Sequence, residues 1–366
     1  MASFDVLIAG AGPAGAAAAR TLATFAPGLR VAVAAVAEKR QCRGEVLSPL
    51  AQPVLRQLGL WPAFLAQGFE PSHRTLTAWG DAGLRSSELL LEARGPAWRV
   101  DRARFDGWIA GEGCRAATRI EAKVVDLERE ADGWAVDCGD DLRHSARLVI
   151  DATGRANALA HRQGWRARAH DRLVAAYAEG AASGQATPEL LVEAFDDGWW
   201  YTMALGNGRR AFVCMTDADI ARSLSLNTPG GWRTALDRTQ FTSAIARRIE
   251  WLEAPRLVPA GGRCAAVPAG FRFLCAGDAA SAFDPISGHG LVKAMRSGIF
   301  AAYAAGDCLV RQDGSALDRY GAWIARETAA YETALRQHYG SEPRWAERPF
   351  WRRRRADHSS SGLSHQ

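Results

Sequence analysis

The sequence contains seven cysteines, but no two of them form a C-x-x-C pair. An odd number of scattered cysteines predicts neither a bound zinc ion or other metal nor a disulfide framework. Such cysteine usage is typical of a protein kept in a reducing cytoplasm. No stretch of about 18 residues is apolar and uncharged throughout, so we expect no membrane span. The apolar start of the chain has no basic segment and carries Asp5 early, unlike a signal peptide.

The chain has little net charge outside its C-terminal end. Its net charge is +5, and residues 341–366 hold six arginines against three acidic residues, a local excess of +3. The remaining residues therefore carry only about +2, too little for a nucleic-acid-binding surface, so no nucleic acid partner is expected. The Arg- and Trp-rich end is typical either of a segment that docks on a partner protein or of a solvated basic end.

Length and composition predict a globular α/β protein with about two domains. The 366 residues are 48% hydrophobic and 23% charged, the balance of an ordinary globular chain. Residues 4–35 have the pattern of a strand, a turn, an Ala-rich helix and a second strand. Residues 119–150 and 165–264 favour strands, the latter interrupted by helical stretches. Residues 290–309 and 315–338 have helical spacing.

A glycine motif lies between the first predicted strand and helix. It reads Gly10-Ala-Gly12-Pro13-Ala14-Gly15. In this position Gly10 permits a tight turn, Gly12 lets the backbone approach a pyrophosphate, and Gly15 lets the helix pack on the strand. The pyrophosphate then lies at the helix N-terminus. The motif therefore predicts a bound dinucleotide.

The acidic residue that normally holds the ribose is displaced. It should end the second strand near Ala35, but the nearest acid is Glu38. Either the strand runs longer and Glu38 binds the ribose, or Glu38 is a loop charge and this contact is lost.

A second glycine turn identifies the dinucleotide. Gly277-Asp278 is followed by Pro285, Gly288 and Gly290. This segment resembles the GD motif of FAD-dependent monooxygenases related to aromatic hydroxylases, flavin halogenases and geranylgeranyl reductases. The resemblance implies that Asp278 binds the ribityl chain of FAD and that the other three residues bring backbone close to the isoalloxazine ring. The helix from Gly290 would direct its positive end toward the flavin N1–C2 carbonyl.

Three further segments resemble the same superfamily. In residues 100–106 the family's arginine, here Arg102, contacts the FAD phosphate or ribose. Residues 43–49, which begin with Arg43, resemble a segment beside the cofactor, and residues 151–155 resemble the turn that closes the FAD domain. Four motifs in the family's order imply FAD as the cofactor.

The resemblance implies a Rossmann-like FAD-binding domain with an interleaved β-sheet substrate domain and a C-terminal helix. The expected boundaries are an FAD-binding domain at 1–70, 97–164 and 265–312, a substrate domain at 71–96 and 165–264, a C-terminal helical segment at 313–355 and a disordered tail at 356–366. Only one G-x-G-x-x-G follows a strand, so no separate nicotinamide-binding domain is expected. Electrons would come from NAD(P)H that docks transiently or from a separate reductase.

Several segments resemble a narrower group, the flavoproteins that mature tryptophylquinone enzymes such as lysine and glycine oxidases. They are residues 43–49, 78–80, 98–102, 198–201, 215–219 and 339–351. Tryptophan halogenases carry a catalytic lysine soon after the first of these segments. The only lysines here are Lys39, Lys123 and Lys293, which argues against that activity.

The resemblance implies flavin monooxygenation, in which a C4a-hydroperoxide formed from dioxygen hydroxylates an electron-rich aromatic ring. The ring belongs to a small molecule or to a tryptophan of a partner protein. Trp199 and Tyr201 would share one face of a strand and could stack on it, or they could be packing residues. His289 is a candidate acid or base, or a loop histidine, and Glu45 is a candidate near the ring, or a helix cap. The alternatives are a reductase of the geranylgeranyl reductase type and a flavin halogenase.

Overall fold

The computed structural model describes residues 2–36, 44–88, 95–165, 167–182, 189–206 and 208–355. The expected tail, residues 356–366, lies outside them. The chain divides into two compact units, each built from three segments. Unit 1 comprises residues 1–72, 91–171 and 261–329, and unit 2 comprises residues 73–90, 172–260 and 330–366.

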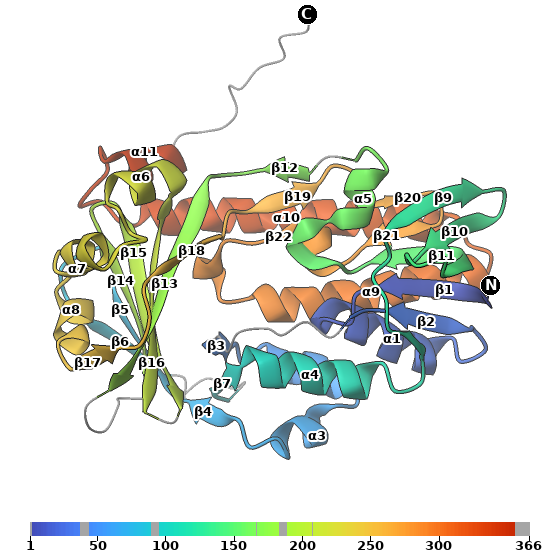
Figure 1. Ribbon diagram of the computed structural model, residues 1–366, viewed down its shortest axis with the longest axis horizontal. Helices are drawn as coiled ribbons and strands as arrows, with labels where there is room; N and C mark the ends of the chain where they lie inside the picture. The colour runs from blue at the N-terminus through green and yellow to red at the C-terminus, as the bar shows by residue number, and fades with distance from the viewer. Residues whose placement is uncertain are drawn as a thin grey trace, which may run out of the picture. The chain divides into compact units, whose positions relative to one another are not determined.

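Unit 1 is built on a sheet whose central strands are parallel, in the order β21-β11-β1-β2-β8 (Figure 1). β20 pairs with β21, and the β9–β10 hairpin pairs with β11. The strands of this sheet are β1 (Ala2–Ala9), β2 (Val31–Ala34), β8 (Thr118–Ile120), β9 (Asp126–Glu130), β10 (Gly133–Asp137), β11 (Arg143–Asp151), β20 (Ala269–Gly270) and β21 (Phe273–Cys275).

The other elements of unit 1 are helices and two small sheets. The helices are α1 (Pro13–Phe25), α2 (Ala51–Gln57), α3 (Trp61–Leu65), α4 (Arg102–Gly113), α5 (Ala158–Arg162) and α9 (Gly290–Val310). One sheet consists of β3 (Gly44–Leu47), β7 (Ala97–Asp101) and β4 (Glu70–Ser72). The other consists of β12 (Ala167–Ala169), β19 (Arg263–Ala265) and β22 (Ser281–Ala282).

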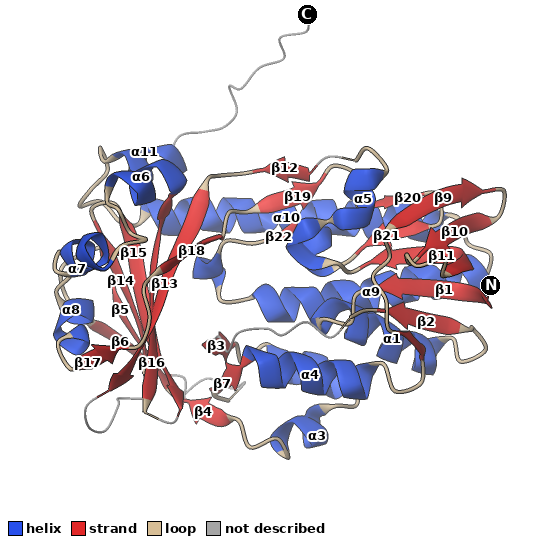
Figure 2. Ribbon diagram, in the orientation of Figure 1, coloured by secondary structure: helices blue, strands red, loops and turns tan. Residues whose placement is uncertain are grey.

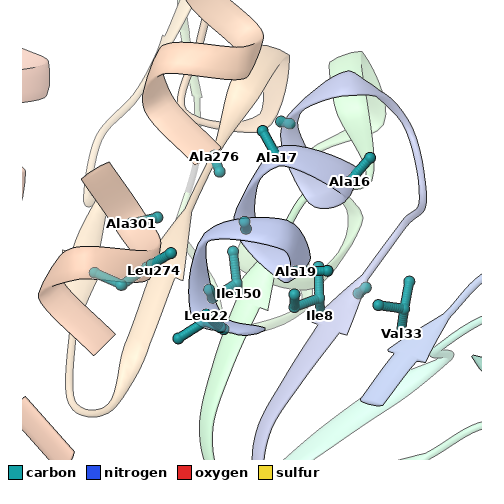
Figure 3. Close-up of a cluster of buried hydrophobic side chains, with 14 of the residues drawn as sticks. Ile8, Ala16, Ala17, Ala19, Leu22, Val33, Ile150, Leu274, Ala276 and Ala301 are labelled. Atoms are coloured by element: carbon teal, nitrogen blue, oxygen red, sulfur yellow. The ribbon is translucent and has the colours of Figure 1, made fainter. Parts of the chain in front are cut away.

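Small residues bring the helices of unit 1 close together. α1 packs against α4 and α9, and its alanines are buried with Ile8, Val33, Ile150 and Leu274 of the sheet (Figure 3). A Cβ added to Gly298 of α9 would lie 2.1 Å from the carbonyl oxygen of Ala14. The Ala-rich sequence of α1 therefore serves close packing, and it keeps the start of this helix in a fixed position on the sheet.

Unit 2 is built on a mostly antiparallel sheet in the order β17-β13-β16-β15-β14-β5-β6, with β18 also paired to β13. Only the pairing of β14 with β5 is parallel among these neighbours. The strands are β5 (Arg74–Ala78), β6 (Arg85–Glu88), β13 (Leu173–Ala182), β14 (Leu190–Phe195), β15 (Gly198–Gly206), β16 (Arg209–Asp217), β17 (Ile249–Trp251) and β18 (Arg256–Pro259).

Helices cover one face of this second sheet. They are α6 (Ala218–Ser223), α7 (Pro229–Leu236) and α8 (Phe241–Ala246) (Figure 2). Trp200, Phe212 and Cys214 point to that face and form a buried cluster with residues of these helices. The boundary between the units falls inside α10 (Ser315–Gly340), and α11 (Pro349–Arg355) ends the described chain. Among the described residues, no helix is both long and apolar enough to cross a bilayer.

Candidate functional site

Three neighbouring strands of unit 1 end at the same edge of the sheet. Ala9, the last residue of β1, is paired with Asp151 of β11, and Asp151 is paired with Cys275 of β21. A glycine-containing turn follows each strand. A Cβ placed on Gly277 would lie 2.8 Å from the Cβ of Ala14. Two glycine turns that are far apart in the sequence therefore adjoin, at the edge where open α/β sheets bind their ligands.

The first of these turns allows close approach of the backbone. Gly10 has a φ of +107°, and a Cβ there would lie 2.4 Å from the carbonyl oxygen of Ala152. A Cβ on Gly15 would lie 1.9 Å from the oxygen of Gly10. Gly12 has open space beside it, and no side chain caps α1, which begins at Pro13. The first N–H groups of α1 therefore remain available to a phosphate.

Positive charge surrounds Asp278 in the second turn. The Lys293 ammonium of α9 lies 2.7 Å from Oδ1, and the Arg155 Nε lies 3.6 Å from Oδ2. Burial by itself raises the pKa of the Asp278 carboxyl, but Lys293, Arg155 and Arg102 outweigh it and hold the pKa below its ordinary value. The carboxyl is therefore ionised at neutral pH. Its side chain is one-third exposed, so it can still accept a hydrogen bond from a ligand hydroxyl.

Arg102 is the first residue of α4 and is held by two carboxylates. Its Nη1 donates to Glu45 of β3 at 2.6 Å, and its Nη2 donates to Asp106 at 3.0 Å. Burial by itself lowers the pKa of Arg102, but Coulombic attraction and hydrogen bonds from both carboxylates outweigh it, and the pKa is raised. Because Arg102 also lowers the pKa of Asp278, the turn that contains Asp278 and the segment that contains Arg102 belong to one electrostatic cluster. Glu45 is placed here as an ion-pair partner of Arg102.

The segment before α9 presents bare backbone. Pro285 starts a single 3₁₀ turn that ends at Gly288, which has a φ of +62°. Neither Gly288 nor Gly290 has any atom within 4 Å of a Cβ placed on it. His289 is the N-cap residue of α9 without a side-chain cap, and burial lowers the pKa of its imidazole. The neutral imidazole is therefore favoured, and a flat ligand can approach the backbone at this turn.

The predicted aromatic residues lie on the sheet of unit 2. Trp199 and Tyr201 share one face, with ring centroids 5.9 Å apart, and Trp200 points to the opposite, helix-covered face. Trp199 is 1% exposed, and its indole N–H donates to the Tyr339 hydroxyl at 3.0 Å. Tyr201 is half-buried. Of the pair, Tyr201 is therefore the one that a ligand can reach, while Trp199 packs beside it.

Comparison with known proteins agrees with this geometry. A model of the FAD binding domain family matches residues 3–323. The chain belongs to this family of FAD-dependent oxidoreductases. In an alignment of 379 positions that covers 100% of both chains, it is 30% identical to the FAD-dependent oxidoreductase LodB of Marinomonas mediterranea. The α/β fold, the FAD-binding domain and the enzyme class expected from the motifs are confirmed.

Two solved structures are similar over nearly the whole flavoprotein. The myxobacterial chondrochloren halogenase CndH has a TM-score of 0.86 at 21% identity, over 98% of this chain and 87% of that one. The peptidyl tryptophan dihydroxylase QhpG, described as essential for tryptophylquinone cofactor biogenesis, has a TM-score of 0.74 at 24% identity, over 100% and 81%. At these identities the likeness shows a shared fold.

Two predicted cofactor residues lie outside the described part of the flavoprotein. They are Glu38, expected at the ribose, and Arg43, expected beside the cofactor. Both fall in the segment 37–43, so their roles stay predictions.

Sequence reasoning missed the lysine of the site. Lys293 was counted only as evidence that a halogenase lysine is absent, yet its ammonium contacts Asp278. The available signal was its place in the GD segment, four residues after His289 at the start of α9, together with the scarcity of lysine in the chain. Lys293 lies in the first turn of α9, at the same end of the helix as Gly288 and Gly290.

The Arg-rich end makes ion pairs that the sequence did not predict. Arg348 pairs with Asp197 at 2.9 Å, and Arg353 pairs with Asp217 and Asp219, each at 2.7 Å. All these residues belong to unit 2. Arg348 and Arg353 are thus engaged in ion pairs within their own unit.

Proposed function

We propose that this flavoprotein is a monooxygenase that hydroxylates an electron-rich aromatic ring. The observation that carries the cofactor side of this proposal is the meeting of the two glycine turns, with the Cβ position of Gly277 2.8 Å from Ala14. The oxidoreductase family, the full-length likeness to LodB and the shared fold with QhpG support the reaction class. The substrate we propose is a tryptophan of a partner polypeptide, or else a small aromatic molecule.

The cofactor residues fit FAD. Gly10, Gly12, Pro13, Ala14 and Gly15 would place the pyrophosphate on the open start of α1, because no side chain occupies that position.

The second turn and its neighbours would hold the rest of the coenzyme. Gly277 and Asp278 would hold the ribityl chain, with the ionised carboxylate accepting from a hydroxyl. Arg102 would contact a phosphate or the ribose while Glu45 keeps its guanidinium in place. Pro285, Gly288 and Gly290 would receive the ring on bare backbone, and the open Cβ positions of the two glycines are what such a flat group requires.

The protein side of the reaction is to bind, orient and exclude water. Bound FAD supplies the redox chemistry, which takes electrons from NAD(P)H or from a reductase and uses dioxygen. Tyr201 would contact the aromatic substrate, and Trp199 would hold Tyr201 in place by packing against it. His289, whose pKa is lowered by desolvation, would accept a proton at an imidazole nitrogen.

Alanine substitution at Gly12 tests the cofactor site. The φ of Gly12 is −66° and no protein atom lies near its Cβ position, so Gly12→Ala should fold normally. The new methyl group would instead occupy the space assigned to the pyrophosphate. We expect the FAD dissociation constant to rise at least about tenfold, measured by titrating apoprotein with FAD. Gly111→Ala, an equally open helix position, should bind FAD as the wild type does. Equal binding by both variants would refute the pyrophosphate site.

Oxygen uptake tests the reaction. The purified protein should be yellow, and with an electron donor it should consume dioxygen when a tryptophan peptide or an indole is added. Mass spectrometry of the product should show added oxygen. Reduction of the flavin by substrate without dioxygen would instead favour a reductase, and a colourless protein that cannot be loaded with FAD would rule out both.

A halide experiment separates hydroxylation from halogenation. CndH is a halogenase of the same fold, but no lysine occurs between residues 50 and 100 of this chain, where tryptophan halogenases carry theirs. Chloride or bromide should therefore leave the product unchanged. A halogenated product would contradict the proposal.

A further inference from the structure

We infer that Lys293 is a positioning residue for the coenzyme, which fixes one oxygen of Asp278 and supplies positive charge that favours the reduced over the oxidised flavin. This inference rests on the proposed FAD site. It concerns a residue that no motif assigns.

The contacts of Lys293 are specific. Its ammonium donates to Asp278 Oδ1 at 2.7 Å and to the carbonyl oxygen of Ser281, and it lies 4.9 Å from the centre of the Phe283 ring. Two acceptors and an aromatic ring on three sides define one position for the ammonium. The lysine is therefore held in place before any ligand binds.

The pair is asymmetric in its exposure. The Lys293 side chain is 9% exposed, whereas that of Asp278 is 33% exposed. Lys293 occupies Oδ1, and Oδ2 has Arg155 Nε at 3.6 Å, beyond hydrogen-bond distance. This geometry suits a carboxylate with one oxygen fixed from inside and the other presented outward.

Two positive charges face the carboxylate of Asp278 at this turn. They are Lys293 and Arg155, whereas Arg102 of the same cluster is paired with two carboxylates of its own. Arg155 is itself fixed by donating to the carbonyl oxygens of Gly261 at 2.7 Å and Phe283 at 3.2 Å. Lys293 also lies near the start of α9, whose backbone dipole adds positive potential at its N-terminus. Reduction adds negative charge to a flavin, so this charge should stabilise the reduced form more than the oxidised form.

The test compares three variants of the full chain for their affinity for oxidised FAD and for their flavin midpoint potential. The potential reports the ratio of the affinities for reduced and oxidised FAD, because the two equilibria are linked. Lys293→Met removes charge and donor, Lys293→Gln keeps a donor without charge, and Lys293→Arg keeps the charge. Circular dichroism and thermal unfolding check that each variant is folded.

We expect Lys293→Met to weaken FAD binding about tenfold, because Asp278 loses the charge-assisted hydrogen bond that fixes its carboxylate. In Lys293→Met and Lys293→Gln the ratio of reduced to oxidised affinity should fall by roughly threefold to tenfold, which makes the potential more negative. Lys293→Arg should restore the wild-type ratio.

Folded Met and Gln variants with an unchanged ratio would overturn the inference, since a purely structural lysine would weaken both affinities equally. That outcome leaves the proposed function intact, because it requires that the wild type binds FAD. A wild type that fails to bind FAD would instead refute the proposed function itself.

Discussion

Asp151 shows how a motif residue can serve the site without touching a ligand. It is fully buried, and burial raises the pKa of its carboxyl against the hydrogen bonds that lower it. Oδ1 accepts from the Thr153 N–H at 2.9 Å and from its hydroxyl at 2.6 Å, while Oδ2 accepts from the N–H groups of Leu159 and Ala160, both at 3.2 Å. Asp151 thus ties the turn after β11 to the start of α5. That turn is the one that Gly10 packs against.

Substituting Asp151 by asparagine should destabilise unit 1. The amide offers one oxygen in place of two, and its NH₂ group would face N–H donors. We expect a loss of about 2–3 kcal/mol in the free energy of unfolding, measured by urea denaturation. Asp132→Asn, at a side chain that is 94% exposed, should change stability by less than about 0.5 kcal/mol. Equal stability of Asp151→Asn and the wild type would show that the turn does not depend on the carboxylate.

At the scale of elements, α11 fastens the end of the chain to the sheet of unit 2. Trp351 is fully buried, and its indole N–H donates to the carbonyl oxygen of Phe195 on β14 at 3.0 Å. Earlier in the same segment, Glu342 is also fully buried and accepts from the Gly80 N–H at 2.7 Å. Residues 342–355 are therefore attached to the rest of unit 2 by buried contacts as well as by the ion pairs of the arginines.

Truncating Trp351 should weaken the attachment of α11 to the sheet of unit 2. Trp351→Ala removes a buried ring and leaves the Phe195 carbonyl without its donor, so we expect a loss of about 3–5 kcal/mol in the free energy of unfolding. Limited proteolysis should then cut unit 2 faster. Arg352→Ala, on the exposed side of the same helix, is the matched control and should be nearly neutral. If both variants resist the protease equally, α11 is not needed to hold unit 2.

At the scale of the whole molecule, each unit has a hydrophobic core of its own, and the proposed FAD residues all belong to unit 1. A ligand stabilises the part of a protein that binds it by RT ln(1 + L/Kd), which grows with the logarithm of the free ligand concentration L. FAD binding should therefore raise the stability of unit 1 directly and that of unit 2 less.

Hydrogen exchange can measure this difference. With FAD at about 100 times its dissociation constant, the stabilisation should be about 2.7 kcal/mol. Exchange should slow most in α1, β11 and the first turns of α9, and less in β15 and β16. The Gly12→Ala variant at the same FAD concentration should be stabilised by only about 1.4 kcal/mol or less, because its dissociation constant is at least about tenfold higher. Slowing confined to unit 2 would contradict the assignment of the cofactor to unit 1.

Patterns of apolar residues along the chain predicted helices and strands, because such elements depend on residues that are neighbours in the sequence. The helices predicted over 290–309 and 315–338 appear as Gly290–Val310 and Ser315–Gly340. Contacts between distant segments could not be read in this way. Glu193 of β14 caps α8 by accepting from the N–H groups of Gln240 at 2.6 Å and Thr242 at 2.7 Å, and no local signal marks it. The acidic partners of Arg348 and Arg353 lie between 134 and 152 residues away in the sequence.

The sequence by itself determined the cofactor class, because glycine is required wherever backbone must approach backbone or a ligand, and such positions keep a fixed spacing along the chain. Gly10, Gly15 and Gly277 are three of them. Only the tertiary structure decided how the charges are paired. Examples are the ion pairs of Lys293 with Asp278, of Arg102 with Glu45, and of the tail arginines with acidic residues of the same unit. The energy of an ion pair depends on the distance between the charges in space, so the pairing produces no periodic pattern in the sequence.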